Sequence, residues 1–238
     1  MSTMIDFELL DAIDARTYRA QKPFPFVNPE NLVRREAWEE LEATLPTLED
    51  MDESFGKQRV AGQEPHDRYS LEYTDEVRVS PAWKKFIDEL RGDRYRKNVC
   101  RLYGVRNVEF RFHWHYAPPG RSVSPHVDQS REYGSHIFYF NAPEWQDEWG
   151  GHTLVMDDHG RLNQKSAPAL EDFDDVTQTE CVGSRSLLFL GRGHGWHAVK
   201  PIRCPEGYLR RVFIIVIGTT NPYWRIRDWV IGKKPQRY

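Results

Sequence analysis

The sequence contains little cysteine, and its few cysteines form no pattern. Cys100, Cys181 and Cys204 are scattered and odd in number, so they supply neither a metal-binding spacing nor a disulfide framework. Such usage is typical of a reducing compartment, and we expect a cytoplasmic protein. The first residues include early acids and lack a basic stretch before an apolar run, so no signal peptide is expected.

Strong net charge and long apolar runs are also missing. The formal net charge is −3 for 238 residues, which gives no bulk attraction to nucleic acid or to acidic membranes. The longest wholly apolar run, 212–217, is far shorter than the ~20 residues that a membrane helix needs. We therefore expect no nucleic-acid partner and no membrane association.

Large side chains are plentiful. Hydrophobic residues make up 39% of the chain and aromatic residues 13%, which is enough for a well-packed domain of this length. We expect one domain over 1–238. Its parts would be a helical N-terminal support over about 1–105, the core over about 106–220 and a C-terminal tail over 221–238.

The N-terminal part carries helix signals. Asn28 followed by Pro29 is a typical helix start, so the sequence predicts a helix over about 28–45. Ser80 and Pro81 predict a second helix that ends at Gly92. Its apolar face recurs at i, i+3, i+4 and i+7, through Trp83, Phe86, Ile87 and Leu90. Residues 46–68 are polar with little periodicity, and we expect a loop there.

After Gly104 the hydrophobic period changes from helical spacing to two. Apolar residues alternate with polar ones over 110–116, and short strands are expected at 123–128, 136–141, 152–156, 186–190, 197–199 and 210–218. Short strands with turns between them predict an antiparallel sandwich or barrel. The jelly roll is the version that carries metal sites in its mouth. The predicted fold class is therefore mostly β (α+β), with N-terminal supporting helices.

Three residues are candidate metal ligands. His126 and Asp128 are one residue apart, and side chains at i and i+2 of a strand point to the same face. His197, which follows an apolar strand and a glycine-rich turn, is the best third ligand, with His194 as its rival. Two histidines and one carboxylate on one side of an octahedron form the facial triad of non-haem Fe(II) oxygenases.

With these residues in view, the chain resembles the Fe(II)/2-oxoglutarate-dependent dioxygenases, and within them the prolyl-hydroxylase-like branch. The resemblance covers about 110–218, roughly half of the chain. It rests on HVD at 126–128, FYFN at 138–141, WGGHT at 149–153, LLF at 187–189, WHAV at 196–199, RRVFIIVI at 210–217, and Tyr116 ten residues before His126.

The resemblance implies a double-stranded β-helix (jelly-roll) core with Fe(II) held by His126, Asp128 and His197. It implies 2-oxoglutarate and O2 as co-substrates, ascorbate as an optional reductant, and hydroxylation of a substrate C–H bond with release of succinate and CO2. Tyr139 would bind the carboxylate of 2-oxoglutarate that lies far from the metal, and Tyr116 would line the same pocket. The substrate would be a small molecule or a protein side chain. The sequence specifies neither its identity nor an oligomeric state.

The far carboxylate of 2-oxoglutarate would also need a cation. Arginine suits it, because the guanidinium binds carboxylates bidentately and stays charged when buried. Arg210 and Arg211 begin the last expected strand and point to opposite faces. We expect Arg210 to face inward, because Val212 rather than Phe213 then stands beside the co-substrate. Arg211 would be a solvated surface residue.

Two alternatives come from other classes of protein. One is a cupin-like metal-binding or sugar-binding protein without redox chemistry, and the other is a non-oxidative metalloenzyme. Neither requires a buried arginine and tyrosine for a carboxylate, so both are less favoured than the oxygenase. The long acidic connection over 157–184 would be either a lid over the site or plain surface structure.

Overall fold

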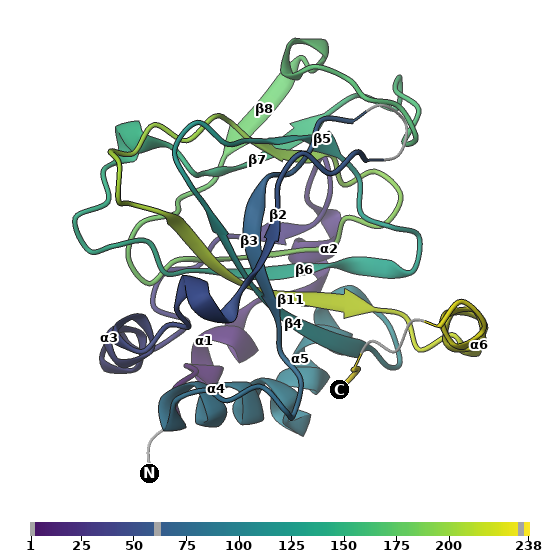
Figure 1. The fold of residues 1–238 in the computed structure, drawn as a ribbon. Helices are drawn as coiled ribbons and strands as arrows, with labels where there is room; N and C mark the ends of the chain where they lie inside the picture. The colour runs from purple at the N-terminus through teal and green to yellow at the C-terminus, as the bar shows by residue number, and fades with distance from the viewer. Residues whose placement is uncertain (1–2, 60–62, 233–235) are drawn as a thin grey trace.

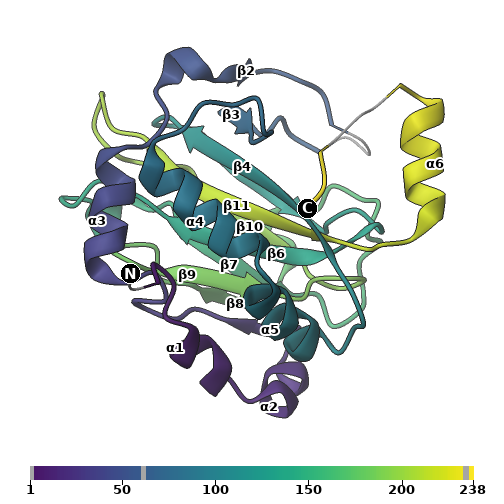
Figure 2. The same cartoon turned by 90° about the horizontal axis from the view of Figure 1, so that it is seen from below.

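The computed structural model describes residues 3–59, 63–232 and 236–238. It has three layers (Figure 1): helices cover one face of a larger β-sheet, and a smaller β-sheet lies over the other face. Seen from below, α1, α3, α4 and α5 lie across the larger sheet (Figure 2). The two sheets enclose the region where the candidate ligands meet.

The helices are mostly short. They are α1 (Phe7–Ala12), α2 (Ala15–Ala20), α3 (Arg35–Ala43), α4 (Pro81–Arg91), α5 (Asp93–Tyr103) and α6 (Pro222–Val230). The expected start of α4 is confirmed: the Ser80 side chain accepts a hydrogen bond from the Trp83 backbone N–H, and Pro81 is the first helical residue. Among the described residues, no helix combines the length and the apolar character that a membrane span requires.

The helix expected from Asn28 begins later than predicted, at Arg35. The Asn28 side chain is engaged elsewhere: it donates to the backbone oxygens of Glu180 (3.1 Å) and Ser186 (2.8 Å) and accepts from the Glu180 N–H (2.7 Å). Because these groups cannot also cap a helix, a residue that looked like a cap instead ties the N-terminal segment to the sheet.

In the described part of the chain, eleven strands form two antiparallel sheets. The larger sheet has the order β1 (Phe26–Val27), β9 (Ser186–Phe189), β6 (Glu132–Tyr139), β11 (Arg210–Gly218), β4 (Glu109–Ala117), β3 (Arg68–Glu72), β2 (Asp52–Ser54). The smaller sheet has the order β5 (Val123–His126), β10 (His197–Val199), β7 (Thr153–Asp157), β8 (Asp175–Gln178). The predicted jelly-roll class is confirmed.

The expected loop over 46–68 was wrong in part, because it contains β2 and the first residue of β3. The acidic connection over 157–184 contains β8, and the C-terminal segment 221–238 contains α6. The residues of β8 are all exposed, and those of β2 are exposed or half-buried. Edge strands of this kind have no apolar alternation, so the sequence carried no signal for them.

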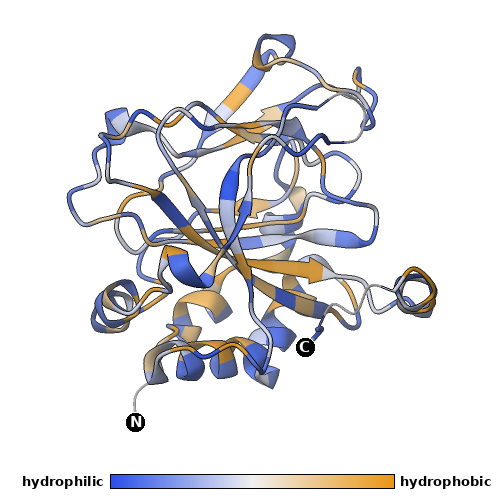
Figure 3. Ribbon diagram, in the orientation of Figure 1, coloured by the Kyte–Doolittle hydropathy of each residue, from blue (hydrophilic) through white to orange (hydrophobic). Residues whose placement is uncertain are grey.

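The main core lies between the helices and the larger sheet. The Trp83 ring of α4 packs against Trp114 of β4 (centroids 5.1 Å apart) and Phe213 of β11 (5.0 Å). Figure 3 shows β11 as a mostly hydrophobic strand. Because strand residues alternate between faces, the other face of β4 and β11 is free to line a cavity between the sheets.

Candidate metal centre

A cavity of about 240 Å³ opens between the two sheets. Both sheets contribute polar side chains to its wall, and the described lining residues with ionisable groups are Arg59, His66, Asp67, Arg68, His115, His126, Asp128, Glu132, His197 and Arg210. Pockets of roughly 300–1,000 Å³ accept drug-sized ligands. This cavity therefore suits a small co-substrate together with part of a substrate.

The three candidate ligands meet in this cavity. β5 and β10 pair antiparallel with His126 directly opposite His197, and Asp128 lies two residues beyond His126, just after β5 ends. One ligand atom from each of His126, Asp128 and His197 lies within 4.8 Å of the others, and His197 Nε2 lies 3.8 Å from Asp128 Oδ1. We call these three residues the metal-ligand set.

Hydrogen bonds at Nδ1 leave the Nε2 atom of both histidines free to bind a metal. His126 Nδ1 lies 2.9 Å from the backbone oxygen of Ser124, and His197 Nδ1 lies 2.8 Å from that of Gly195. A carbonyl oxygen only accepts hydrogen bonds, so each Nδ1 carries the hydrogen and each Nε2 keeps a lone pair. This backbone support is what metal-binding histidines use to fix their tautomer.

The remaining properties of the metal-ligand set also fit a cation. Burial, together with His197 and His66, holds the pKa of His126 well below its usual range, so this imidazole stays neutral and can bind metal. Asp128 Oδ2 is buried and has no hydrogen-bond partner among the described residues. Because an unpaired buried carboxylate oxygen is costly, the set fits a divalent metal such as Fe(II).

A glycine-rich turn presents His197. Gly195 N–H donates to the Gly191 backbone oxygen (2.8 Å), and a Cβ atom on Gly195 would lie only 2.2 Å from Gly191 Cα. The turn therefore requires glycine where residue 195 approaches Gly191. In this conformation the Gly195 oxygen accepts the hydrogen bond from His197 Nδ1. The rival ligand His194 is exposed in this turn and lies outside the cluster that the described residues form.

Arg210 lies in the same cavity and faces inward. Its Nε donates to the Gly151 backbone oxygen (2.5 Å), and its Nη2 lies 3.4 Å from Thr153 Oγ1. No acidic side chain of the described residues pairs with it, although it is buried. The guanidinium thus keeps donors available for a bound anion.

Arg211 points to the opposite face, but it is not the solvated residue that we expected. Its Nη2 lies 2.5 Å from Glu42 Oε1 of α3, and both side chains are only about one-fifth exposed (22% and 19%). The ion pair therefore connects β11 to the helical layer, a partner that strand alternation could not predict.

The two candidate tyrosines differ in position. Tyr139 is fully buried beside Arg210, whose Cζ lies 5.6 Å from its ring centre, and its hydroxyl bonds Thr153 Oγ1 at 2.8 Å. The structure does not bring Tyr116 to the cavity: it packs in the core on the helical side and donates to the Pro46 oxygen (3.1 Å). Strand alternation puts Tyr116 on the face of Trp114, whereas His115 and Ala117 line the cavity.

Sequence reasoning missed the cavity residues before the core, Arg59, His66 and Arg68. The His66 ring lies 4.7 Å from that of His126, and its Nε2 is 3.1 Å from Ser124 Oγ. Burial, followed by the charges of Arg59 and Arg68, lowers the pKa of His66 to about 3. The polar segment 46–68 offered no period from which these contacts could be predicted.

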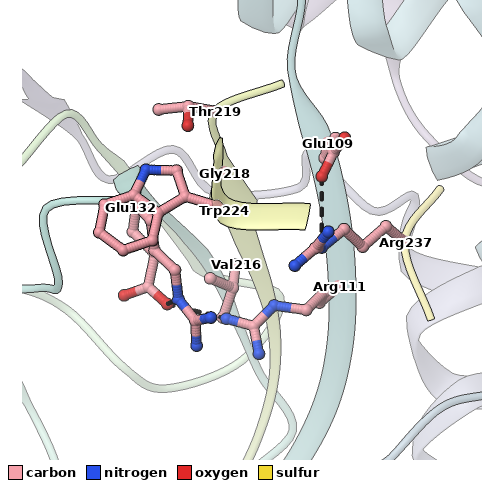
Figure 4. A pocket seen from close by; sticks show the side chains of 9 residues that line it. Glu109, Arg111, Glu132, Val216, Gly218, Thr219, Trp224 and Arg237 are labelled. Atoms are coloured by element: carbon pink, nitrogen blue, oxygen red, sulfur yellow. Dashed lines mark hydrogen bonds and ion pairs between the residues drawn. The ribbon is translucent and has the colours of Figure 1, made fainter. Parts of the chain in front are cut away.

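Two other polar clusters differ from the metal-ligand set. Asp157, His159 and Asp175 lie close together on the surface, but each ring nitrogen of His159 already faces a carboxylate, at 3.5 and 3.1 Å. The second is a hollow of only about 20 Å³, whose lining side chains, Trp224 among them, are drawn in Figure 4.

The hollow of Figure 4 is filled by ion pairs. Arg237 Nε lies 3.3 Å from Glu109 Oε2, and Arg111 Nη2 lies 2.8 Å from Glu132 Oε1. Burial, and next the charge of Asp128, raises the pKa of Glu132 to about 7. Because its charges are matched from within the chain, this hollow joins the C-terminal residues to β4 and β6 and leaves little room for a ligand.

No protein-family model matches the sequence, and no curated protein matches it. Solved structures do match the fold. A prolyl-4-hydroxylase from Pseudomonas putida is 16% identical with a TM-score of 0.58, over 86% of this chain and 97% of that one. A prolyl hydroxylase from Trichoplax adhaerens, in complex with a peptide fragment of the hypoxia inducible factor oxygen degradation domain, is 15% identical with a TM-score of 0.63, over 89% and 90%.

A third structural neighbour performs different chemistry. It is the non-heme α-ketoglutarate-dependent carbocyclase SnoK from nogalamycin biosynthesis, which is 10% identical with a TM-score of 0.60, over 93% of this chain and 88% of that one. Identities this low establish the fold and leave the reaction open. The chain has the double-stranded β-helix fold of the Fe(II)/2-oxoglutarate-dependent dioxygenases, with prolyl hydroxylases among its structural neighbours.

Proposed function

We propose that the protein is an Fe(II)/2-oxoglutarate-dependent dioxygenase that hydroxylates a substrate C–H bond and releases succinate and CO2. One observation carries the proposal: a single cavity holds the metal-ligand set and Arg210, a buried guanidinium without an acidic partner among the described residues. 2-Oxoglutarate is a dicarboxylate that requires a metal ion to bind one of its ends and a cationic side chain to bind the other.

Each group has a defined task in this proposal. His126, Asp128 and His197 would hold Fe(II), which when bound supplies the activation of O2. Arg210 would bind the carboxylate of 2-oxoglutarate far from the metal, and Tyr139 would support it through Thr153, to which both side chains extend (2.8 and 3.4 Å). The buried walls of the cavity would exclude water from the reacting centre.

The alternatives from other classes leave Arg210 unexplained. A cupin-like metal- or sugar-binding protein, or a non-oxidative metalloenzyme, has no need for a guanidinium held by two oxygens deep in the cavity. Burial of an arginine without an anion is costly, and a dicarboxylate co-substrate offsets that cost. The oxygenase is therefore the function that the cavity supports best.

The proposed substrate is a small molecule or a side chain of a peptide. One structural neighbour was solved with a peptide, and another is a carbocyclase that belongs to natural-product biosynthesis. For this chain, hydroxylation is the outcome we propose, with O2 as the oxidant and ascorbate as the optional reductant.

Anaerobic calorimetry with Mn(II) in place of iron tests the proposal. Wild-type protein should bind 2-oxoglutarate in the presence of Mn(II) and not in its absence. With Fe(II), ascorbate and O2, it should then form succinate slowly even without its substrate. If the Mn(II)-loaded protein does not bind 2-oxoglutarate, the oxygenase proposal fails and the non-redox alternative replaces it.

A further inference from the structure

Two further arginines line the cavity, and neither has an acidic partner among the described residues. Arg68 of β3 donates from Nη1 to the His66 backbone oxygen (3.0 Å), and Arg59 donates from Nε to Gln63 Oε1 (3.3 Å). Arg68 Nε is buried and makes no hydrogen bond within the described part of the chain. Most of the donors of these guanidinium groups are therefore available.

The acids in the cavity wall are already occupied. Asp67 accepts hydrogen bonds from Arg121 Nη1 (2.8 Å) and from the Gly56 N–H (2.7 Å). Glu132 accepts from Arg111 Nη2 (2.8 Å). Asp128 belongs to the metal-ligand set, so none of the three can neutralise Arg59 or Arg68 without losing another partner.

The cavity carries more positive charge than the binding of 2-oxoglutarate requires. Arg59, Arg68 and Arg210 all line the cavity, and the proposed function uses only Arg210. Burial lowers the pKa of Arg68, and the nearby charge of Arg59 lowers it further. Two like charges in a partly buried site disfavour each other, and a bound anion removes that cost. Arginine is also the residue best suited to bind carboxylate or phosphate in a fork.

The arginine pair lies close to the metal-ligand set. His66, whose backbone oxygen accepts from Arg68, places its ring 4.7 Å from that of His126. Arg59 lines the same cavity as Asp128. An anion held by the pair would therefore lie beside the place where a substrate carbon must be oxidised.

We infer that Arg59 and Arg68 bind an anionic group, a carboxylate or a phosphate, carried by the substrate itself. The inference rests on the proposed function and narrows its substrate class to anionic molecules. The anionic group lies near the carbon that is hydroxylated, because the cavity of about 240 Å³ also has to hold 2-oxoglutarate.

Nuclear relaxation by bound Mn(II) tests this inference with defined probes. Protein saturated with Mn(II) and 2-oxoglutarate is titrated with inorganic phosphate, followed by ³¹P relaxation, and separately with acetate, followed by ¹³C relaxation. The anion that binds more tightly identifies the group. Arg68→Gln should weaken binding by about tenfold or more, the loss expected for hydrogen bonds to a charged group. Arg68→Lys should restore part of it.

Two controls make the result specific. Arg161→Gln removes an exposed arginine that lies outside the cavity and pairs with Asp174, and it should change anion binding less than about twofold because exposed pairs contribute little. Calorimetry should show that Arg68→Gln still binds 2-oxoglutarate like the wild type, which also shows that the variant is folded.

Several outcomes would overturn the inference. Equal relaxation in the wild type and Arg68→Gln means that the anions bind the metal directly. Equal losses in Arg68→Gln and Arg161→Gln would mean that only the overall charge of the protein affects anion binding. If Arg68→Gln abolishes 2-oxoglutarate binding while Arg210→Ala does not, the two cations have exchanged roles. Failure of the wild type to bind 2-oxoglutarate instead disproves the proposed function.

Discussion

Two backbone oxygens decide how the histidines of the metal-ligand set are presented. Those of Ser124 and Gly195 each accept the Nδ1–H of an imidazole, and His197 Nε2 lies 3.8 Å from Asp128 Oδ1. Because the three ligands bind one ion together, loss of any one should remove far more than a third of the free energy of metal binding.

Alanine at any position of the metal-ligand set should abolish tight metal binding. His126→Ala, Asp128→Ala and His197→Ala each leave two ligands, and removal of Asp128 also removes the charge that balances the cation. Mn(II) binding followed by electron paramagnetic resonance measures the loss, and circular dichroism confirms that the variants fold. His194→Ala is the matched control: if it loses the metal and His197→Ala does not, the assignment is wrong.

Arg210 and Arg211 should have separable effects. Arg210→Ala leaves the far carboxylate of 2-oxoglutarate without its charged partner, a loss of about 3–5 kcal/mol, or roughly a hundredfold or more in affinity. Arg211→Ala should leave 2-oxoglutarate binding unchanged. It should instead lower the free energy of unfolding by about 1–3 kcal/mol, because Glu42 loses its partner.

Calorimetric titration with 2-oxoglutarate also tests the role of Tyr139. Tyr139→Phe removes the hydroxyl that bonds Thr153, so its loss of 2-oxoglutarate affinity should fall between those of Arg211→Ala and Arg210→Ala. If Arg211→Ala weakens 2-oxoglutarate binding more than Arg210→Ala, then Arg211 acts on the co-substrate and the proposed role of Arg210 is wrong.

A buried histidine away from the cavity should make the protein sensitive to acid. Burial lowers the pKa of His136 to about 3, and its Nδ1 lies 2.7 Å from the Tyr95 hydroxyl. Between about pH 6.5 and 3 the unfolded chain therefore binds a proton at this residue that the folded chain does not. Its contribution to stability is complete above pH 6.5 and is lost as the pH falls.

His136→Asn should reduce this pH dependence. The slope of the unfolding free energy against pH, measured by urea denaturation between pH 6 and 4, should fall by up to about 1.4 kcal/mol per pH unit. Some slope should remain, because burial also lowers the pKa of His113 to about 3. An unchanged slope would mean that His136 is protonated in the folded protein.

At the scale of elements, short β-strands and tight turns carry the site. β5 and β10 are only a few residues long, yet their register puts His126 and His197 opposite each other. β11 supplies Arg210 to the cavity and Phe213 to the core from neighbouring positions on alternate faces. In the turn between β9 and β10, the shape of the backbone depends on glycine at position 195.

Gly195→Ala should weaken metal binding through this turn. The new Cβ would lie 2.2 Å from Gly191 Cα and 2.6 Å from its oxygen, so the backbone must move and the Gly195 oxygen must leave His197 Nδ1. Loss of such outer support typically reduces metal affinity roughly 10–100-fold. The measurement is Mn(II) affinity by electron paramagnetic resonance.

Gly193→Ala serves as the control in the same turn. A Cβ there meets nothing within 4 Å, and only its φ of +94° is unfavourable, at a cost of about 1–2 kcal/mol in stability. It should therefore keep its metal affinity. If both variants lose metal equally, strain anywhere in the turn matters and the contact with Gly191 is not the cause.

At the scale of the whole molecule, the aromatic core joins the helical layer to the larger sheet. Trp83 is fully buried, donates from its indole N–H to the Leu41 oxygen (3.0 Å), and contacts rings of β4 and β11. The helices thereby hold the face of the sheet opposite the cavity. The site depends on this layer for stability, although none of the three residues of the metal-ligand set, as found among the described residues, lies on a helix.

Trp83→Ala should lower the free energy of unfolding by about 3–5 kcal/mol, the range for large buried aromatic residues. Guanidinium denaturation measures this change. Trp229→Ala is the matched control: that side chain is 76% exposed on α6, so the change should stay within about 0.5 kcal/mol. A similar loss in both variants would mean that α6 packs on the molecule in solution.

Local patterns predicted the elements whose residues face a core. The bounds expected for β10 and β11 agree with the structure, and α4 begins directly after the capping residue Ser80. Sequence patterns predicted the wrong role for residues whose contacts come from distant parts of the chain. Asn28 bonds the backbone of the sheet rather than capping a helix, and Tyr116, placed in the pocket by its spacing to His126, packs on the other face of β4.

The sequence by itself determined the side chains and the faces on which they lie. Period-two alternation separates Arg210 from Arg211, and the one-residue gap between His126 and Asp128 makes them candidate partners. Only the tertiary structure decided that His197 lies opposite His126 in paired strands. It also decided that Arg211 forms an ion pair with Glu42, and that Arg59 and Arg68 have no acidic partner among the described residues. The reason is physical: alternation is local along one strand, whereas strand register and charge pairing depend on how distant segments pack.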